Sequence, residues 1–216
     1  MAGTGFTLLS CHAMEILAQV GIGVAVFAAT NVDDILLLSA FFSDPHLRIR
    51  SIVAGQFLGI GALVAASVGA ALTALAIPEG WTALLGLVPL GLGLHRLRAV
   101  RLTVTSTEAD AQQIRAAENA ATWGASSQVL AVAGVTVANG GDNLGAYIPL
   151  FASARGAIPV YAIVFALMTT LWCAIGYLLV NNRLVATHLR RYGHVLLPYV
   201  LIALGLYILS GARVLI

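Results

Sequence analysis

Hydrophobic residues fill six long stretches of this chain, and polar residues gather in the segments between them. The stretches cover roughly residues 16–42, 51–77, 81–94, 128–151, 157–180 and 195–214. A helix needs about 20 apolar residues to cross a bilayer, and most of the stretches exceed that length. The third stretch is shorter, but it can continue through Leu97. The pattern predicts an all-α polytopic membrane protein with six transmembrane helices.

Composition supports a membrane protein, and the placement of the basic residues predicts its orientation. The chain is 60% hydrophobic and 9% charged, and all eleven basic residues are arginine. The segments after the first, third and fifth stretches carry Arg48, Arg50, Arg96, Arg98, Arg101, Arg115, Arg183, Arg190 and Arg191. Only Arg155 and Arg213 lie on the other side. The positive-inside rule makes the first set cytoplasmic and places both the N-terminus and the C-terminus outside.

The two halves of the chain repeat one another. The interval in the sequence from Asp33 to Asp142 equals the interval from Pro89 to Pro198, and it is close to half of the chain length. We call this interval the half-chain offset. We therefore predict a first three-helix repeat over 1–98, a cytoplasmic linker over 99–127 and a second repeat over 128–216. Three spans per half would insert the second half upside down, as in transporters whose substrate site lies between inverted repeats.

Each half carries a short acidic motif inside its first apolar stretch. The motifs are residues 29–34, Ala-Thr-Asn-Val-Asp-Asp, and residues 138–143, Ala-Asn-Gly-Gly-Asp-Asn. Carboxylates within the hydrocarbon layer are costly and usually functional. We expect no basic residue at the depth of these three carboxylates, and this imbalance predicts a bound cation.

The polar side chains of each motif fall on one face of a helix, because residues three and four apart are neighbours. Hard divalent cations favour carboxylate and carbonyl oxygens of this kind. The candidate metal ligands are Thr30, Asn31, Asp33, Asp34, Asn139, Asp142 and Asn143.

Adjacent Asp33 and Asp34 point about 100° apart on a regular helix, so both reach one ion only if the helix bends or unwinds. Gly140 and Gly141 weaken the second motif helix, and we expect a break there. A break near Asn31 has less support. Broken helices expose carbonyl groups that can bind ions at the midplane of the membrane.

Two further features bear on helix packing. Pro89 and Pro198 are expected to kink the third and sixth helices and to act as hinges. Gly55 and Gly59 have the spacing that lets two helices approach closely in lipid. We assign this pair a packing role.

The acids also suggest how transport could be driven. Burial raises the pKa of a carboxyl group, and a bound cation lowers it. A site with two or three Asp side chains can therefore exchange protons for a metal ion. The resulting hypothesis is proton antiport, in which the ion enters from the cytoplasm and protons enter from outside.

Several motifs resemble those of the bacterial cadmium-resistance transporters. The matching segments are 30–34 with 41–42, 138–143 with 147–151, 86–89, and 198–199 with 205–207. The Asn-Gly-Gly-Asp-Asn run is the most specific of them. The resemblance implies a secondary transporter of the lysine-exporter superfamily that exports cadmium, with zinc as a second cargo, across the bacterial cytoplasmic membrane. It carries over Asp33, Asp34 and Asp142 as the acidic positions.

This interpretation implies no enzyme activity, no catalytic residue and no permanently bound cofactor. The expected partners are the lipid bilayer, the metal ion and protons, without nucleic acid; a homo-oligomer stays open. Cadmium is soft and prefers thiolate, and neither motif contains Cys. Export of manganese, calcium, an amino acid or another organic cation is therefore the alternative. A passive channel is a further alternative. An intramembrane aspartyl protease is more distant, because the spacing before Asp142 departs from Gly-x-Gly-Asp.

Overall fold

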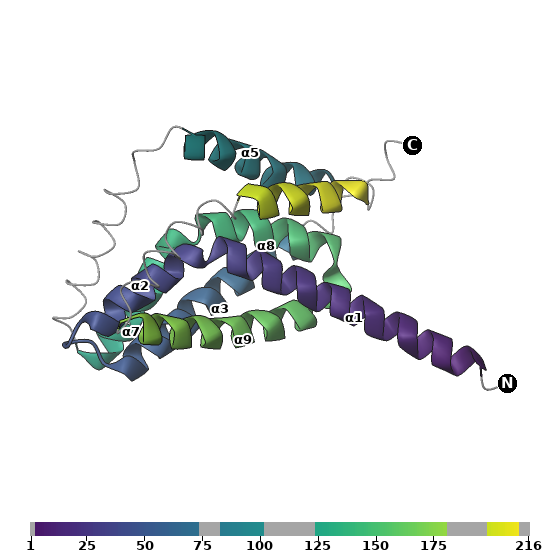
Figure 1. The fold of residues 1–216 in the computed structure, drawn as a ribbon. Helices are drawn as coiled ribbons and strands as arrows, with labels where there is room; N and C mark the ends of the chain where they lie inside the picture. Colours follow the sequence, from purple (N-terminus) through teal and green to yellow (C-terminus); the bar gives the residue numbers. More distant parts are fainter. Residues whose placement is uncertain (1–2, 74–82, 102–123, 181–197, 212–216) are drawn as a thin grey trace.

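The computed structural model describes residues 3–73, 83–101, 124–180 and 198–211, and every element in these ranges is helical (Figure 1). In chain order the elements are α1 (Gly3–Thr30), α2 (Val32–Ser43), α3 (Ile49–Thr73), η2 (Ala83–Gly86), α5 (Leu87–Arg101), α7 (Ala125–Asn139), α8 (Gly141–Ser153), η3 (Arg155–Ala157), α9 (Ile158–Leu179) and an unlabelled helix, Pro198–Ser210. The predicted all-α class is confirmed for these ranges.

Within the described ranges, three helical segments are long and apolar enough to cross a membrane, namely Ala13–Thr30, Ile49–Thr73 and Arg155–Leu179. Ala125–Asn139 and Pro198–Ser210 are shorter apolar helices. These lengths support a multi-pass membrane protein. The number of six spans and the side on which each terminus lies stay predictions.

Both motif helices are broken within their motifs. Asn31 separates α1 from α2, with φ −116° and ψ 20°, and Gly140 separates α7 from α8, with φ −78° and ψ 18°. The expected break at Gly140 is confirmed, with Gly141 as the first residue of α8. The weaker expectation at Asn31 is confirmed as well. Gly140 also lies so close to the Leu63 side chain of α3 that an added Cβ would collide with it.

Helix boundaries repeat at the same half-chain offset as the motifs. The paired boundaries are the ends of α1 and α7 at Thr30 and Asn139, the starts of α2 and α8 at Val32 and Gly141, and the starts of α3 and α9 at Ile49 and Ile158. The two halves therefore share one plan of local structure. Their opposite orientation in the membrane and the three domain ranges stay predictions.

The halves are interlocked rather than separate. Helix α2 packs against α9, and its counterpart α8 packs against α3, while α1 lies on α9 and α7 lies on α3. An aromatic cluster joins the halves at the centre. Phe27 of α1 contacts Phe165 and Trp172 of α9, and Tyr147 of α8 stacks on Phe165 with ring centroids 4.5 Å apart.

Glycines allow close approach at two helix contacts. A Cβ on Gly55 would lie 2.6 Å from Cβ of Val132, and one on Gly59 would lie 2.6 Å from Cβ of Thr136. The packing role predicted for this pair is thus confirmed at the contact of α3 with α7. Helix α5 and the helix Pro198–Ser210 lie side by side in the same manner (Figure 1), since a Cβ on Gly205 would lie 2.7 Å from Cβ of Leu90 on α5.

Pro89 lies near the start of a helix rather than in its interior, and the kink and hinge expected there stay predictions. It is the third residue of α5, directly after the 3-10 helix η2. The first amide groups of a helix have no intrahelical acceptor, so a proline there loses no hydrogen bond. The last helix is described from Pro198 onward, and the residues in which a kink would show lie outside the described ranges. Pro149 lies inside α8 instead.

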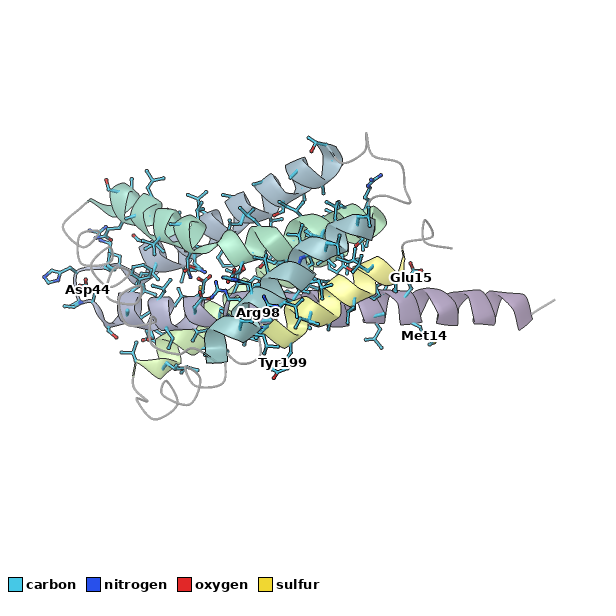
Figure 2. All side chains as sticks on the ribbon, turned by 90° about the horizontal axis from the view of Figure 1, so that it is seen from above. Met14, Glu15, Asp44, Arg98 and Tyr199 are labelled. Atoms are coloured by element: carbon cyan, nitrogen blue, oxygen red, sulfur yellow. The ribbon has the colours of Figure 1, made fainter. Side chains whose placement is uncertain are left out.

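Two helices are longer than the sequence pattern predicted. Helix α1 begins at Gly3 rather than near residue 16. The N-terminal part of α1 extends beyond the rest of the protein, at the end opposite Asp44, and Met14 and Glu15 lie where it leaves the other helices (Figures 1 and 2). Helix α5 continues through Arg101, so Arg96, Arg98 and Arg101 are helical rather than loop residues. Residues 102–123 of the predicted linker lie outside the described ranges.

The glycine contact predicts that Gly→Ala substitutions on the two faces of α3 differ in their effect on stability. We expect Gly55→Ala combined with Gly59→Ala to destabilise the protein by about 1–3 kcal/mol, because each methyl group would be forced into α7. Gly61→Ala combined with Gly69→Ala is the matched control, since no atom lies within 4 Å of a Cβ at either position. Thermal unfolding in detergent measures both; an equal effect of the two pairs would contradict this packing.

Candidate metal site at the helix breaks

The two acidic motifs meet through one amide group. Nδ2 of Asn139, the last residue of α7, donates to Oδ2 of Asp33 at 2.9 Å and to Oδ1 of Asp34 at 3.2 Å. Both aspartates lie in the first turn of α2, directly after the break at Asn31. The side chains of two successive residues therefore converge on a single NH2 group, and their binding of one ion stays a prediction.

Asp34 is buried, and its hydrogen-bond partners are neutral. Its side chain is 3% exposed, and Oδ2 accepts a bond of 2.9 Å from Nε2 of Gln56 on α3. Thr136 of α7 in turn donates to Oε1 of Gln56 at 2.7 Å. No basic side chain pairs with Asp34 in the part of the chain that the structure describes. Among these residues, the side chains bonded to Asp34 are amides.

Sequence reasoning missed Gln56 and Thr136 as part of the site. The available signal was a lone amide side chain within the apolar run of α3, between Gly55 and Gly59. Thr136 precedes Asn139 by three residues and so shares its helix face. Burial of both side chains shows that they belong to the polar network inside the protein.

Asn31 joins the two breaks. It is fully buried, and Nδ2 donates to the Tyr147 hydroxyl at 2.8 Å and to the Phe27 carbonyl oxygen at 2.9 Å. Its Oδ1 accepts a bond of 3.0 Å from Nδ2 of Asn143 on α8. Its own carbonyl oxygen, released by the break, accepts a bond of 2.6 Å from the Trp172 indole. These contacts pair the groups that interruption of the helix would otherwise leave without partners.

Thr30 also forms hydrogen bonds at the break between α1 and α2. Its hydroxyl donates to the Val26 carbonyl oxygen at 3.0 Å and accepts from Nδ2 of Asn31 at 3.0 Å. The side-chain oxygens of Thr30 and Asn31 are therefore already engaged within the protein. Of the seven predicted ligands, Thr30 and Asn31 thus form hydrogen bonds within the protein at the break between α1 and α2.

Asn143 offers an oxygen that is not used. The residue is 3% exposed, Nδ2 is bonded to Asn31, and Oδ1 has no hydrogen-bond partner among the described residues. A buried acceptor without a donor is uncommon, because its lost hydration is not replaced. A cation beside Asn143 would supply the missing interaction.

Asp142 departs from the prediction. It forms an ion pair with a guanidinium nitrogen of Arg96 on α5, with side-chain exposures of 17% for Asp142 and 45% for Arg96. The expectation that no basic side chain lies beside the three carboxylates is therefore wrong for Asp142. Within the described ranges, no group of three or more His, Cys, Asp or Glu side chains is gathered where it could hold a metal ion.

Helix dipoles add to the electrostatics of the carboxylates. Asp33 and Asp34 lie in the first turn of α2, and Asp142 lies in the first turn of α8. The partial positive charge at a helix N-terminus stabilises a carboxylate by about 0.3–1 kcal/mol near a surface. The two breaks thus provide two positive helix ends, each with acidic side chains beside it.

Comparison with known proteins identifies the family. The family model described as "Cadmium resistance transporter" matches residues 27–215, which include both breaks and every residue of the site. No curated protein and no solved structure shows a significant match. The matched range covers most of the sequence, and the chain therefore belongs to the cadmium resistance transporter family.

Proposed function

We propose that this protein exports a divalent metal ion, cadmium or zinc, by proton antiport across the bacterial cytoplasmic membrane. The ion is held at the helix breaks by Asp33 and Asp34, with Asn139 and Asn143 beside it. The observation that carries the proposal is the burial of Asp34 next to a second carboxylate, with only neutral side chains bonded to it among the described residues.

The charge of Asp34 requires compensation that the described residues do not provide. Removal of a carboxylate from water is costly, and a hydrogen bond to an amide returns only part of the lost hydration energy. The Asn139 NH2 group lies within hydrogen-bond distance of both Asp33 and Asp34. A divalent cation bound to the same two carboxylates would replace the partial charge of an amide with two full charges.

The donor chemistry bears on the cargo. The oxygens of Asp33, Asp34 and Asn143 suit hard cations such as calcium and manganese, whereas cadmium has a stronger preference for sulfur. Cys173 is buried in the hydrophobic core on α9. Family membership favours cadmium, and competition among metals decides between it and the harder ions.

Proton coupling follows from the repulsion between Asp33 and Asp34 when no metal ion is bound. Two adjacent carboxylates repel one another, and either a bound metal ion or a bound proton relieves that repulsion. Release of the metal is therefore linked to proton uptake. The broken helices provide the movable parts, as in transporters where short half-helices line the substrate site.

An enzyme is not supported. The family is one of transporters, and Asp142, the second acid that a protease dyad would need, is paired with Arg96. Transport of a cation is the function that the site supports best.

We expect Asp34→Asn to weaken cadmium binding at least tenfold, about 1.4 kcal/mol. The substitution removes the charge but keeps an oxygen that can accept from Gln56, so the protein should remain folded. Isothermal titration of purified protein with cadmium, zinc, manganese and calcium would measure the effect.

Asp44→Asn is the matched control for this substitution. Asp44 lies at the other end of α2, where its carboxylate bonds to His46 in the exposed turn. This variant should bind metal like the unmodified protein. Equal binding by the Asp34→Asn and Asp44→Asn variants would rule out the proposed site.

Proton antiport predicts a response to an imposed pH gradient. In proteoliposomes, cadmium flux should rise when the compartment that receives the metal is more acidic, because protons then drive release from the site. Reversal of the gradient should slow the flux. A flux that ignores the gradient would leave metal transport intact but eliminate proton coupling, as expected of a passive channel.

A further inference from the structure

The ion pair of Asp142 with Arg96 has no part in the metal site as proposed so far. Asp142 corresponds to Asp33 at the half-chain offset, and its carboxylate is bonded to the Arg96 guanidinium. Both members of the pair are partly exposed at the surface of the helix bundle, since the Arg96 side chain is 45% exposed and that of Asp142 is 17% exposed. Because almost half of the Arg96 side chain is free of protein contacts, it has room to move away from Asp142.

Helix packing brings the arginine to the acid. A Cβ on Gly145 of α8 would collide with the side chain of Leu92 on α5. Gly145 follows Asp142 by three residues, and Leu92 precedes Arg96 by four, so each contact residue lies one helical turn from a member of the ion pair. Close contact between the helices at Gly145 therefore sets Arg96 within reach of Asp142.

The other half of the chain carries no arginine at the equivalent position. At the half-chain offset, the counterpart of Arg96 is Gly205. A Cβ on Gly205 would lie 2.7 Å from the Gly86 carbonyl oxygen and 2.7 Å from Cβ of Leu90. The packing of the last helix against α5 leaves no room for a side chain at this position. The repeat thus has an arginine at one of these two equivalent positions only.

We propose that Arg96 is a tethered cation that competes with the transported metal for Asp142. In the empty state its guanidinium neutralises Asp142 without a proton. When a divalent ion binds Asp33 and Asp34, a movement of α8 toward α2 lets Asp142 exchange Arg96 for the ion and become a further ligand. Return of Arg96 to Asp142 then promotes release. This inference rests on the proposed metal site and assigns Arg96 a role in setting its affinity.

The test is cadmium binding by full-length protein in detergent, with variants of two arginines on the same helix. Arg96→Gln should bind cadmium about three- to tenfold more tightly than the unmodified protein, because the competitor is removed. Arg98→Gln is the matched control and should leave the affinity unchanged. It removes the same charge two residues further along α5, and within the described ranges the ion pair of Asp142 is with Arg96.

A double variant separates competition from a general change in charge. The gain from Arg96→Gln should vanish when Asp142→Asn is also present, because the acid freed by the first change is then absent. Arg96→Lys, which keeps the charge, should bind close to the unmodified protein. In proteoliposomes, Arg96→Gln should slow cadmium flux despite tighter binding, since release is no longer promoted.

Several results would overturn the proposal. Binding by Arg96→Gln that is equal to or weaker than that of the unmodified protein would do so, as would a gain that persists with Asp142→Asn. If the Gln variant fails to fold, Arg96→Met provides a second neutral side chain of similar length with the same expected gain. Failure of the metal site itself is distinguishable, because Asp34→Asn would then bind like the unmodified protein whatever the Arg96 variants do.

Discussion

A helix that stops inside an apolar layer leaves amide and carbonyl groups without partners, and this constraint governs the centre of the protein. At the first break the Asn31 carbonyl is paired with the Trp172 indole. At the second break the Gly140 carbonyl accepts from the Leu144 amide at 3.0 Å, and α8 begins at once. Polar side chains gather around these points because the backbone there already requires hydrogen bonds. The site is built on that requirement.

The same arrangement brings negative charge into the interior by two different means. Asp34 is held by amides, with Gln56 and Asn139 as its donors. Asp142 is held by the charge of Arg96. An amide network costs little to rearrange around an incoming ion, whereas an ion pair has to be broken. The two halves of the repeat have similar helix boundaries, but they stabilise Asp34 and Asp142 by different interactions.

Features that depend on a few neighbouring residues could be predicted from the sequence. The length of the apolar runs indicates membrane helices, and Gly140 with Gly141 indicates a broken helix, because both effects are local. The partnership of Arg96 with Asp142 joins residues far apart in the sequence and depends on how α5 lies against α8. The hydrophobic periodicity of the sequence does not indicate how α5 lies against α8. Gln56 was visible as a polar residue in an apolar helix, but its target depends on the position of α2.

Interlocking of the halves has a consequence for synthesis of the protein. Helix α2 rests on α9, and α8 rests on α3, so each broken helix is covered by the opposite half. When α1 and α2 leave the ribosome, neither Asn139 nor Trp172 has yet been made. The Asn31 carbonyl group and the Asp34 carboxylate therefore lack these two hydrogen-bond donors while α1 and α2 are in the translocon or in lipid. The two halves therefore cannot fold independently, one after the other, during synthesis. Its polar centre is completed only when nearly the whole polypeptide has been inserted.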